Sequence, residues 1–559
     1  MGMRVLIVGG VAGGMSAAAR ARRLSESAEI IVFERGPHVS YANCGLPYFL
    51  GGEITDRKKL LVQTPERLRA VFNVDVRTRS EVTAIHRERR EIEVRDLVSG
   101  HTTTERYDAL ILSTGAAPIV PGVPGTERPG QFALRTLEDM DQIDAWVRDR
   151  AARTAVVVGG GFIGLEVAEQ FHERGLRVAV VERNPQVLKP FDPEMAAHLH
   201  LELRGHGVAL HLSNGLARFD GPGAGETAGA SVVVLADGTR LPADVIVTGL
   251  GVRPESQLAV AAGLDLGRTG GIKVDAHLRT SDPHIYAVGD AIEVTHAVTG
   301  APALIPLGGP ANRQGRTAAD NIFGIASAYP GTLGTAIVRV FGLAAAVTGA
   351  NEAQLRAAGI TFEAVHLHPN SHAGYYPGAK ALSLKILFAP DSGKLLGAQA
   401  VGADGVDKRI DVLATALRAG MTVDDVADLE LCYAPPFGSA KDPVNLAGMV
   451  AQNVRAGRVR TIQWDAVARL DRSRALVLDV RDAQERAGGA IPGSVHIPLG
   501  ELRTRLDELP RDREIVAHCA SGQRSYTACR VLMQHGFQCR NLVGSFKTWK
   551  AAQDGLLPR

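Results

Sequence analysis

The chain has 559 residues, of which 45% are hydrophobic and 22% are charged, an ordinary composition for a globular protein. This length exceeds what one hydrophobic core can organise, so we expect several domains. The formal net charge of +2 predicts no general attraction to nucleic acid or to an anionic membrane. The 5 cysteines are scattered and form no CxxC pair, which argues against a disulfide framework and against a metal site.

The N-terminus and the apolar runs bear on where the protein works. Met1–Arg4 lead directly into an apolar strand and then into glycines, which is not the pattern of a secretory signal. The apolar runs are short and interrupted, so no transmembrane helix is expected. Together with free thiols, these features favour a cytoplasmic protein with neither nucleic acid nor membrane as a partner.

The first segment with a chemical signature is a predicted strand–turn–helix–strand unit. A strand at Val5–Val8 is followed by a glycine-rich turn at 9–14, a helix and a second strand that ends before Glu34. In such a unit, backbone N–H groups at the helix N-terminus bind a pyrophosphate and the acid bonds a ribose. Val11 stands where the middle glycine normally falls, so this turn should differ from the usual one.

The motif Ser40–Tyr48 contains one cysteine, Cys44, as a candidate nucleophile. Val39 and Phe49 occupy the positions where the partner of a CxxxxC dithiol would stand, so an internal dithiol is excluded. The following Leu-Pro can open a helix, whose N-terminus is expected to lower the pKa of the Cys44 thiol.

A second nucleotide unit begins at Ala155–Val158 and continues through Gly159–Gly164 to a strand that ends before Glu182. Two such units in one chain are far stronger evidence of dinucleotide binding than one. Glu182 favours NADH, because its carboxylate would repel the 2′-phosphate of NADPH, while the adjacent Arg183 keeps NADPH open.

The chain then returns to the first unit through strands expected at Leu110–Gly115 and Ile285–Asp290. A helix is expected near 405–419. Cys432 is expected to be a packing residue, and Arg455–Arg460 a linker.

These motifs resemble the pyridine nucleotide-disulfide oxidoreductases, and the single-cysteine motif looks like their coenzyme A-disulfide reductase branch. The resemblance covers Met1 to about Gly457 and implies an α/β fold with two Rossmann-like domains, for FAD and for NAD. The FAD domain is expected to be discontinuous at 1–115 and 276–328, and the NAD(P)H domain is expected at 150–275. An α+β dimerisation domain is expected at 330–455, which implies a homodimer.

The final domain, expected at 461–559, resembles a rhodanese-like α/β domain. Its loop Cys519–Ser525 follows a strand and precedes a helix, so its N–H groups can point at the Cys519 sulfur while Arg524 adds positive charge. The five-position spacing of Cys519 and Arg524 fits a sulfurtransferase better than a phosphatase. Cys529 and Cys539 are expected to be core or surface thiols.

The resemblance also implies individual site residues. For FAD it implies Gly9, Gly10, Ala12, Gly13, Gly14, Glu34, Arg35, Ser40, Asn43, Thr114, Gly115 and Asp290. For NADH it implies Gly159, Gly161, Phe162, Ile163, Gly164, Glu182 and Gly251. Coenzyme A needs cations for its phosphates, and the candidate contacts are Arg20, Arg22, Arg23, Lys58 and Lys59. Tyr375 is a further candidate substrate contact. Tyr433 is the expected acid and Tyr376 the orienting group, both reaching the site from the other subunit.

The expected activity is the reduction of coenzyme A disulfide, coenzyme A persulfide or polysulfide by NADH through Cys44, while Cys519 carries sulfane sulfur. One alternative is an NADH oxidase or peroxidase in which Cys44 cycles through sulfenic acid. The other is a flavin-bearing redox sensor without enzymatic turnover.

Overall fold

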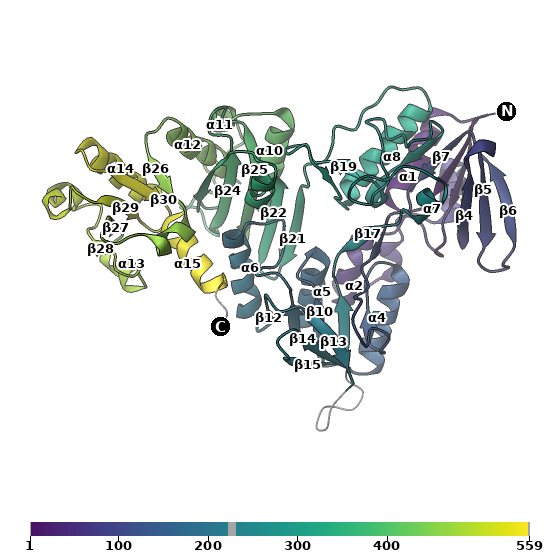
Figure 1. Cartoon of the computed structure of the whole chain (residues 1–559), viewed down its shortest axis with the longest axis horizontal. Coiled ribbons are helices and arrows are strands. Elements are labelled where there is room, and N and C mark those ends of the chain that lie inside the picture. The colour runs from purple at the N-terminus through teal and green to yellow at the C-terminus, as the bar shows by residue number, and fades with distance from the viewer. Residues whose placement is uncertain (1, 222–230, 557–559) are drawn as a thin grey trace. The chain divides into compact units, whose positions relative to one another are not determined.

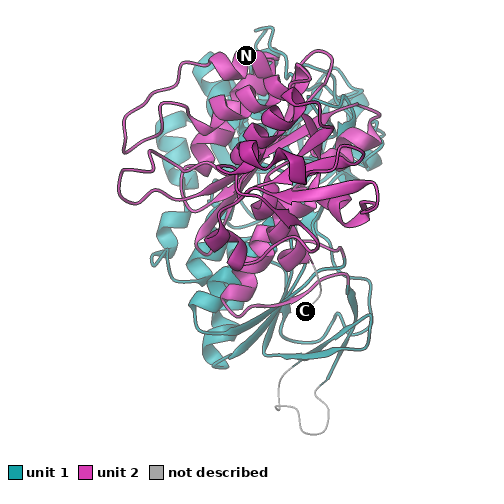
Figure 2. Cartoon of the chain, turned by 90° about the vertical axis from the view of Figure 1, so that its left-hand side faces the viewer, with its two compact units in different colours: residues 1–183, 214–334 teal, residues 184–213, 335–559 magenta. Residues whose placement is uncertain are grey.

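The computed structural model describes residues 2–221 and 231–556 (Figure 1). The chain divides into two compact units, which Figure 2 shows in different colours. Unit 1 comprises residues 1–183 and 214–334, and unit 2 comprises residues 184–213 and 335–559. None of the described helices combines the length and the apolar character that a membrane span requires.

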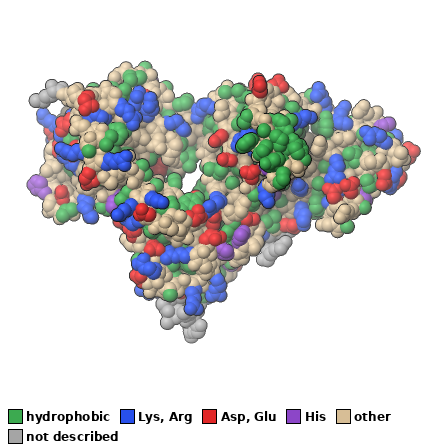
Figure 3. Space-filling model, turned by 180° about the vertical axis from the view of Figure 1, so that it is seen from behind, with side chains coloured by type: hydrophobic (Ala, Val, Ile, Leu, Met, Phe, Trp, Pro, Cys, Tyr) green, Lys and Arg blue, Asp and Glu red, His purple; other side chains and the backbone are tan. Residues whose placement is uncertain are grey.

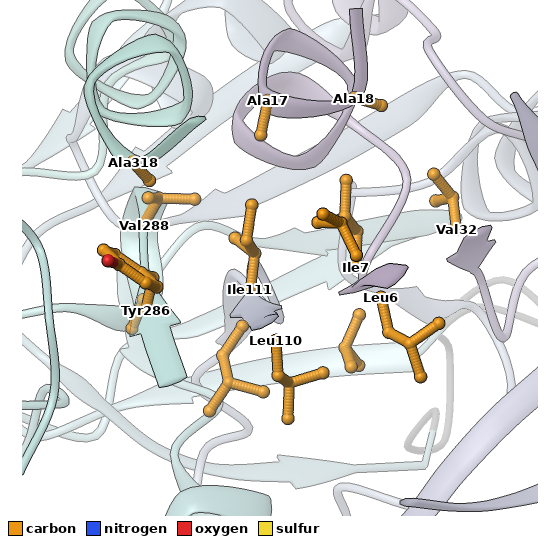
Figure 4. Close-up of a cluster of buried hydrophobic side chains, with 14 of the residues drawn as sticks. Leu6, Ile7, Ala17, Ala18, Val32, Leu110, Ile111, Tyr286, Val288 and Ala318 are labelled. Carbon is orange, nitrogen blue, oxygen red and sulfur yellow. The ribbon is translucent and has the colours of Figure 1, made fainter. Parts of the chain in front are cut away.

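Unit 1 is built around a parallel sheet in the order β18-β7-β1-β2-β3. Its strands are β1 (Arg4–Val8), β2 (Glu29–Phe33), β3 (Asp75–Arg77), β7 (Ala109–Leu112) and β18 (Ile285–Ala287). The inner strands are apolar along nearly their whole length because helices cover a parallel sheet on its faces. In Figure 4, Ala17 and Ala18 lie on one helix and Ala318 on another, above sheet residues that include Ile7 and Ile111.

Those two helices are α1 (Ala12–Leu24) and α8 (Gly308–Ile322), and they pack closely against each other. A Cβ added at Gly315 of α8 would lie 2.2 Å from the carbonyl oxygen of Gly13, so only glycine permits this approach. The N-terminal half of α1, which follows the glycine turn, is thereby held by a segment three hundred residues later in the chain.

A second parallel arrangement in unit 1 confirms the predicted second nucleotide unit. β10 (Thr154–Val158) pairs with β11 (Arg177–Val181) and with β16 (Val245–Thr248), which pairs with β9 (Gln131–Phe132). α5 (Phe162–Glu173) follows β10 directly. Unit 1 also carries antiparallel sheets formed by β4 (Ser80–His86), β5 (Glu91–Asp96) and β6 (Thr102–Arg106), and by β13 (Leu216–Asp220), β14 (Ser231–Leu235) and β15 (Arg240–Ala243).

The middle of unit 2 is an antiparallel sheet in the order β21-β22-β25-β24-β23. Its strands are β21 (Ala336–Val340), β22 (Leu343–Gly349), β23 (Glu363–Leu367), β24 (Leu382–Phe388) and β25 (Leu395–Gly402). The helices of this part are α6 (Pro193–Gly205), α9 (Glu352–Ala357), α10 (Val406–Ala419), α11 (Val423–Asp428) and α12 (Pro443–Arg455). The helix expected near 405–419 is confirmed as α10.

The C-terminal part of unit 2 is a parallel sheet in the order β26-β30-β29-β27-β28. Its strands are β26 (Arg460–Ile462), β27 (Ala475–Asp479), β28 (Val495–His496), β29 (Glu514–His518) and β30 (Cys539–Leu542), and its longer helices are α14 (Gln523–Gln534) and α15 (Ser545–Leu556). This α/β arrangement agrees with the fold expected for the last domain.

The linker expected at Arg455–Arg460 is a short connection that is partly packed. Helix α12 ends at Arg455, Val459 already lies in the core of the C-terminal sheet, and β26 begins at Arg460. The C-terminal part is therefore docked rather than tethered. Helix α15 packs along α6, and the carbonyl oxygen of Gly555 accepts a bond from His200 Nδ1 at 3.0 Å.

A buried ionic cluster reinforces this docking. The Lys385 ammonium on β24 lies 2.7 Å from Asp192, 2.5 Å from Glu194 and 2.6 Å from Glu352. The three carboxylates raise the pKa of Lys385, although its complete burial opposes them. Glu194 also accepts a bond from the Trp464 indole at 3.2 Å, which joins the C-terminal part to the same cluster.

Candidate active site

The two glycine turns of unit 1 repeat the same geometry. The Gly10 N–H donates to Glu34 at 2.8 Å, and the Gly160 N–H donates to Glu182 at 2.8 Å. In each turn the last glycine allows the helix to pack closely against the first glycine of the same turn. A Cβ at Gly14 would lie 1.9 Å from the Gly9 oxygen, and a Cβ at Gly164 would lie 2.0 Å from the Gly159 oxygen.

The two turns differ at their middle position. Apart from its two chain neighbours, no described residue has an atom within 4 Å of a Cβ added at Gly161, so the backbone there faces open space that a pyrophosphate can approach. Phe162 and Ile163 open α5 beside it, and Ile163 is exposed. In the first turn Val11 takes the middle position, and Ala12 and the buried Gly13 begin α1. Both sets of residues fit a dinucleotide.

The loop between β2 and the cysteine is held in a strained conformation. Ser40 has φ of 45°, in the left-handed region that favours glycine. Its N–H donates to the Gly10 oxygen at 2.8 Å, and its own oxygen accepts from Val62 N at 2.9 Å. The Cys44 loop is thereby fixed to the first glycine turn. Asn43 and Cys44 lie in a short 3-10 helix (Asn43–Gly45), and α2 (Leu46–Leu50) follows with proline in its first turn, as predicted.

Cys44 is exposed, and its thiol is not activated in the way that the sequence predicts. Partial burial raises the pKa of the Cys44 thiol, and the negative charges of Glu166 and Asp290 raise it further. The prediction that a helix N-terminus lowers the pKa of the Cys44 thiol is therefore wrong for the chain itself, because burial and two carboxylates outweigh a helix of only five residues.

Glu166 was not singled out by the sequence reasoning. It lies on α5, two residues after the last glycine of the second turn, and accepts a bond from the Tyr48 hydroxyl at 3.0 Å. It therefore connects the helix of the second nucleotide unit to the cysteine loop. Its position in the glycine motif is the only signal in the sequence that could have indicated it.

Asp290, Thr114 and Gly115 lie at the carboxyl ends of the first sheet, where ligands bind in open α/β folds. Burial raises the pKa of Asp290, and the positive charge of Arg135 partly opposes this. The Thr114 hydroxyl donates to the backbone carbonyl oxygen of Glu255 at 2.6 Å, and Arg35 pairs with the Glu255 carboxylate at 2.7 Å.

Gly251 also has a positive φ, of 94°, and its oxygen accepts from the Ile119 N–H at 3.0 Å. It directly precedes β17 (Val252–Pro254), which pairs with β8 (Ala116–Pro118). The observed role of Gly251 is to form the turn that begins this short ribbon.

The cationic residues expected to bind coenzyme A fall into two groups. Lys58 and Lys59 are exposed on a 3-10 helix (Arg57–Leu60), and Arg23 is exposed at the end of α1. Arg20 is paired with Asp320 at 2.6 Å. Arg22 is only 6% exposed and donates to four backbone carbonyls, two at 25–26 and two at 72–73. It therefore joins α1 to these two segments, and its guanidinium is occupied by the chain itself.

The tyrosines singled out in the sequence come together in unit 2. The hydroxyls of Tyr375 and Tyr433 lie 2.9 Å apart, and that hydrogen bond raises the pKa of Tyr375. Tyr376 packs edge-on against His372. Cys432 is exposed beside Tyr433, so the expectation that it packs in a core is wrong.

An exposed apolar patch surrounds these tyrosines. Tyr375 is 77% exposed, Tyr433 47% and Phe437 70%. Figure 3 shows hydrophobic side chains gathered in one dense patch on the middle of unit 2. Large aromatic groups on a surface of this kind mark an interface rather than a solvated face.

The Cys519 loop of unit 2 has the predicted architecture. It follows β29 and precedes α14, and the Gly522 N–H donates to the Cys519 sulfur at 3.1 Å. Burial opposes ionisation of Cys519, but hydrogen bonds from the Ser525 hydroxyl and from three loop N–H groups outweigh it and lower the pKa of the thiol. Cys519 is thus prepared to act as a thiolate.

Arg524 does not present a free positive charge to this loop. Its guanidinium binds both oxygens of Glu485, at 2.6 and 2.7 Å, and lies 3.3 Å from Asp482. The pair raises the pKa of Arg524 and lowers that of Glu485. The geometry therefore makes Arg524 a residue that holds the loop to α13 (Ala483–Ala487).

Comparison with protein families matches three parts of the chain. Residues 3–323 match the pyridine nucleotide-disulphide oxidoreductase model, and residues 335–443 match the dimerisation domain of the same family. Residues 464–552 match the rhodanese-like domain model.

Individual relatives cover most or all of the chain. Coenzyme A disulfide reductase from Staphylococcus epidermidis is 36% identical over 450 residues, which span 80% of this chain and 100% of the relative. The crystal structure of reduced Bacillus anthracis CoADR-RHD is 49% identical, with a TM-score of 0.96, and the match covers 99% of this chain and 98% of that one. The structure of an NAD-dependent persulfide reductase from A. fulgidus is 39% identical, with a TM-score of 0.91, and the match covers 98% of this chain and 100% of that one.

Proposed function

The chain belongs to the pyridine nucleotide-disulphide oxidoreductase family, and from this premise we propose that it reduces sulfur–sulfur bonds with NADH through Cys44. The substrates that we propose are coenzyme A disulfide, coenzyme A persulfide and polysulfide. One observation carries the proposal. Cys44 is exposed, and the sequence of unit 1 contains no second cysteine. The sulfur that forms a disulfide with Cys44 must therefore come from a substrate or from outside this unit.

The cofactors of the family fit the two glycine turns. The first turn, Glu34 and Asp290 would hold FAD, and the turn of Gly159–Gly164 with Glu182 would hold NADH. When bound, FAD supplies the two-electron chemistry that connects NADH oxidation to disulfide reduction. The carboxylate of Glu182 selects NADH, because it would repel a 2′-phosphate.

The chemistry of Cys44 is thiol–disulfide exchange. Its thiolate attacks a substrate sulfur, a Cys44–sulfur bond forms, and the substrate S–S bond breaks. With coenzyme A disulfide the leaving group is the coenzyme A thiolate, and with coenzyme A persulfide it is hydrosulfide. Two electrons from NADH then cleave the mixed disulfide, which restores Cys44 and releases coenzyme A.

The leaving thiolate needs a proton, and the tyrosine pair supports its supply. Tyr433 is the proposed donor. The Tyr375 hydroxyl lies 2.9 Å away, so a proton can pass from it to Tyr433 along this hydrogen bond after Tyr433 has given up its own. We assign Tyr376 to substrate orientation. The exposed apolar patch and the match to a dimerisation domain support a homodimer in which these groups serve the partner's Cys44.

The C-terminal domain supports a second, sulfur-carrying step. Cys519 is buried, its thiol is stabilised as a thiolate, and it can hold sulfane sulfur as a persulfide. Because this domain is docked by the Lys385 cluster and by α15, a diffusible carrier is proposed to move sulfur to Cys44. Coenzyme A, with exposed Lys58 and Lys59 as proposed phosphate contacts, suits that role.

The test is NADH oxidation by the purified protein with one acceptor at a time. Coenzyme A disulfide, coenzyme A persulfide, inorganic polysulfide and hydrogen peroxide are assayed anaerobically, and oxygen is assayed in air-saturated buffer. We expect the coenzyme A sulfur compounds to give the highest kcat/KM. A preference for oxygen or peroxide would replace the proposal with an NADH oxidase or peroxidase. Uniformly slow turnover would favour a redox sensor.

A further inference from the structure

Two cysteines that the proposed mechanism does not use face each other in the C-terminal domain. Cys529 lies on α14 and Cys539 begins β30, and their sulfur atoms are 3.0 Å apart. Both side chains are completely buried. The Cys539 thiol donates to the Cys529 sulfur, so the two groups form a matched pair rather than two isolated packing residues.

The elements that carry the pair are also those that build the Cys519 loop. Helix α14 begins at Gln523, inside that loop, and β30 pairs with β29, which ends next to Cys519. Cys519, Cys529 and Cys539 belong to one hydrophobic cluster. A covalent bond between α14 and β30 would therefore fix the helix that supplies Ser525 to the Cys519 sulfur.

We propose that Cys529 and Cys539 are a reversible dithiol site that sulfane sulfur oxidises to a disulfide. A disulfide requires its sulfur atoms to lie about 2.05 Å apart, so the pair must close by about 1 Å. This inference rests on the proposed function only for the identity of the oxidant, a persulfide or polysulfide.

The reaction balances with a hydropersulfide, RSSH, as the oxidant. One cysteine sulfur attacks the sulfane sulfur, takes it as a persulfide and releases RSH. The second cysteine sulfur then attacks the inner sulfur of that persulfide, forms the Cys529–Cys539 bond and releases hydrogen sulfide. Two cysteine thiols are oxidised, one sulfane sulfur is reduced to sulfide, and the three protons leave on RSH and H₂S.

Burial sets the rate of this oxidation. The hydrogen bond from Cys539 and burial in the core both raise the pKa of the Cys529 thiol well above its usual value. The nucleophilic thiolate is therefore scarce, and the complete burial of both side chains keeps the oxidant away from them. The exposed Cys44 and the activated Cys519 react first, so the disulfide accumulates only under a sustained excess of sulfane sulfur.

Trypsin separates the cysteines of this domain, which makes the test direct. Cleavage after arginine leaves Cys519 in residues 514–524, Cys529 in residues 525–530 and Cys539 in residues 531–540. The flavin-loaded full-length protein is incubated anaerobically with sodium tetrasulfide or with glutathione persulfide, alkylated under denaturing conditions, digested and analysed by mass spectrometry. A parallel sample receives hydrogen peroxide to distinguish sulfane sulfur from a general oxidant.

We expect a linked peptide pair 525–530/531–540 that appears after modification of Cys519 and disappears on treatment with dithiothreitol. Cys529→Ala should abolish it, whereas Cys432→Ala should leave it unchanged. Sulfurtransferase activity of the wild-type protein should change at least several-fold on oxidation and recover on reduction, and Cys529→Ala should show no such change. Absence of the linked pair at sulfane-sulfur concentrations that fully modify Cys519 would overturn the inference. A linked pair that forms with hydrogen peroxide but not with sulfane sulfur would also overturn the inference.

NADH turnover with coenzyme A persulfide, measured on the same samples, separates the two proposals. Normal turnover without the linked peptides refutes only the dithiol site. Linked peptides in a protein that lacks this turnover refute only the proposed reductase function.

Discussion

At the scale of single residues, the acid that serves the leaving thiolate is the most specific assignment. The Tyr433 hydroxyl has one described partner, Tyr375, at 2.9 Å. We predict that Tyr433→Phe lowers kcat with coenzyme A disulfide by roughly 10²-fold, because an aligned general acid contributes on the order of 10²–10⁴. Tyr375→Phe should lower kcat by a smaller factor, since it removes only the group that returns a proton to Tyr433. Steady-state kinetics and the basic limb of the pH profile measure both effects.

Subunit mixing shows whether this tyrosine acts across the dimer. Heterodimers of Tyr433→Phe and Cys44→Ser chains contain one intact site if the groups come from different subunits, and activity above that of either variant is expected. No gain after verified subunit exchange would place the tyrosine in its own subunit's site or outside catalysis.

Several residue assignments could not have been made from the sequence. Tyr375 and Tyr433 are separated by 58 positions in irregular loops, so no periodicity predicts their contact. Cys432 lies in an apolar stretch that reads as buried, yet the chain turns it outward. Arg22 reads as a surface cation, whereas backbone carbonyls of residues 25–26 and 72–73 enclose it.

At the scale of elements, the glycine turns were predictable because their geometry is local. The close contact of Gly164 with Gly159 depends only on a strand, three glycines at fixed spacing and the start of a helix. It does not depend on the rest of the chain. The Lys385 cluster was not predictable. Lys385 stands in a strand that reads as apolar, and its partner Glu194 comes from a helix 191 positions away.

The middle glycine of the second turn gives a prediction for NADH binding. Gly161→Ala places a methyl group in space that the chain leaves open, so folding should be unaffected while the pyrophosphate is obstructed. We expect KM for NADH to rise by at least tenfold and the melting temperature to change little. Gly205→Ala is the matched control and should leave KM unchanged, because its methyl group would also meet no described residue beyond its own helix and chain neighbours. A large fall in the melting temperature of Gly161→Ala would contradict the assignment.

The contact between α6 and α15 gives a prediction for pH. His200 accepts from the Val187 N–H at 3.1 Å and donates to Gly555, so it must be neutral, and burial lowers its pKa from 6.5 to about 4. Between pH 6.5 and 4 the unfolded chain binds more protons, so stability falls as the pH is lowered through this window. At pH 4 the free energy of unfolding should be lower by on the order of 3 kcal/mol because of His200 alone, at about 1.4 kcal/mol for each pKa unit.

Chemical unfolding of wild-type protein and of His200→Gln between pH 7 and pH 4 checks this. The glutamine amide can accept and donate without titrating, so the variant should lose less stability across the window. Equal slopes for both proteins would show that His200 does not carry this pH dependence.

At the scale of the whole molecule, the docking of the C-terminal domain decides how the two cysteines cooperate. Because α15 packs along α6 and the Lys385 cluster reaches Trp464, Cys519 does not travel on a flexible linker. We predict that Cys519→Ala leaves the reduction of added coenzyme A persulfide within about twofold of wild type, while it abolishes sulfur transfer from a donor to a thiol acceptor. Assays of both activities on one preparation measure this. Loss of coenzyme A persulfide reduction in Cys519→Ala would mean that the cysteines exchange sulfur directly.

The most direct test of a reductase acting through Cys44 is anaerobic NADH oxidation with coenzyme A persulfide, compared between the wild-type protein and Cys44→Ser. The variant keeps both glycine turns, so it should retain FAD, and NADH should still bleach the flavin. Its turnover should nevertheless fall by roughly three orders of magnitude, because serine cannot form the mixed disulfide. Cys432→Ser, which removes another exposed thiol, should turn over like the wild type. Turnover of Cys44→Ser within a few-fold of wild type would contradict the account, because the sulfur–sulfur bond would then be broken without Cys44.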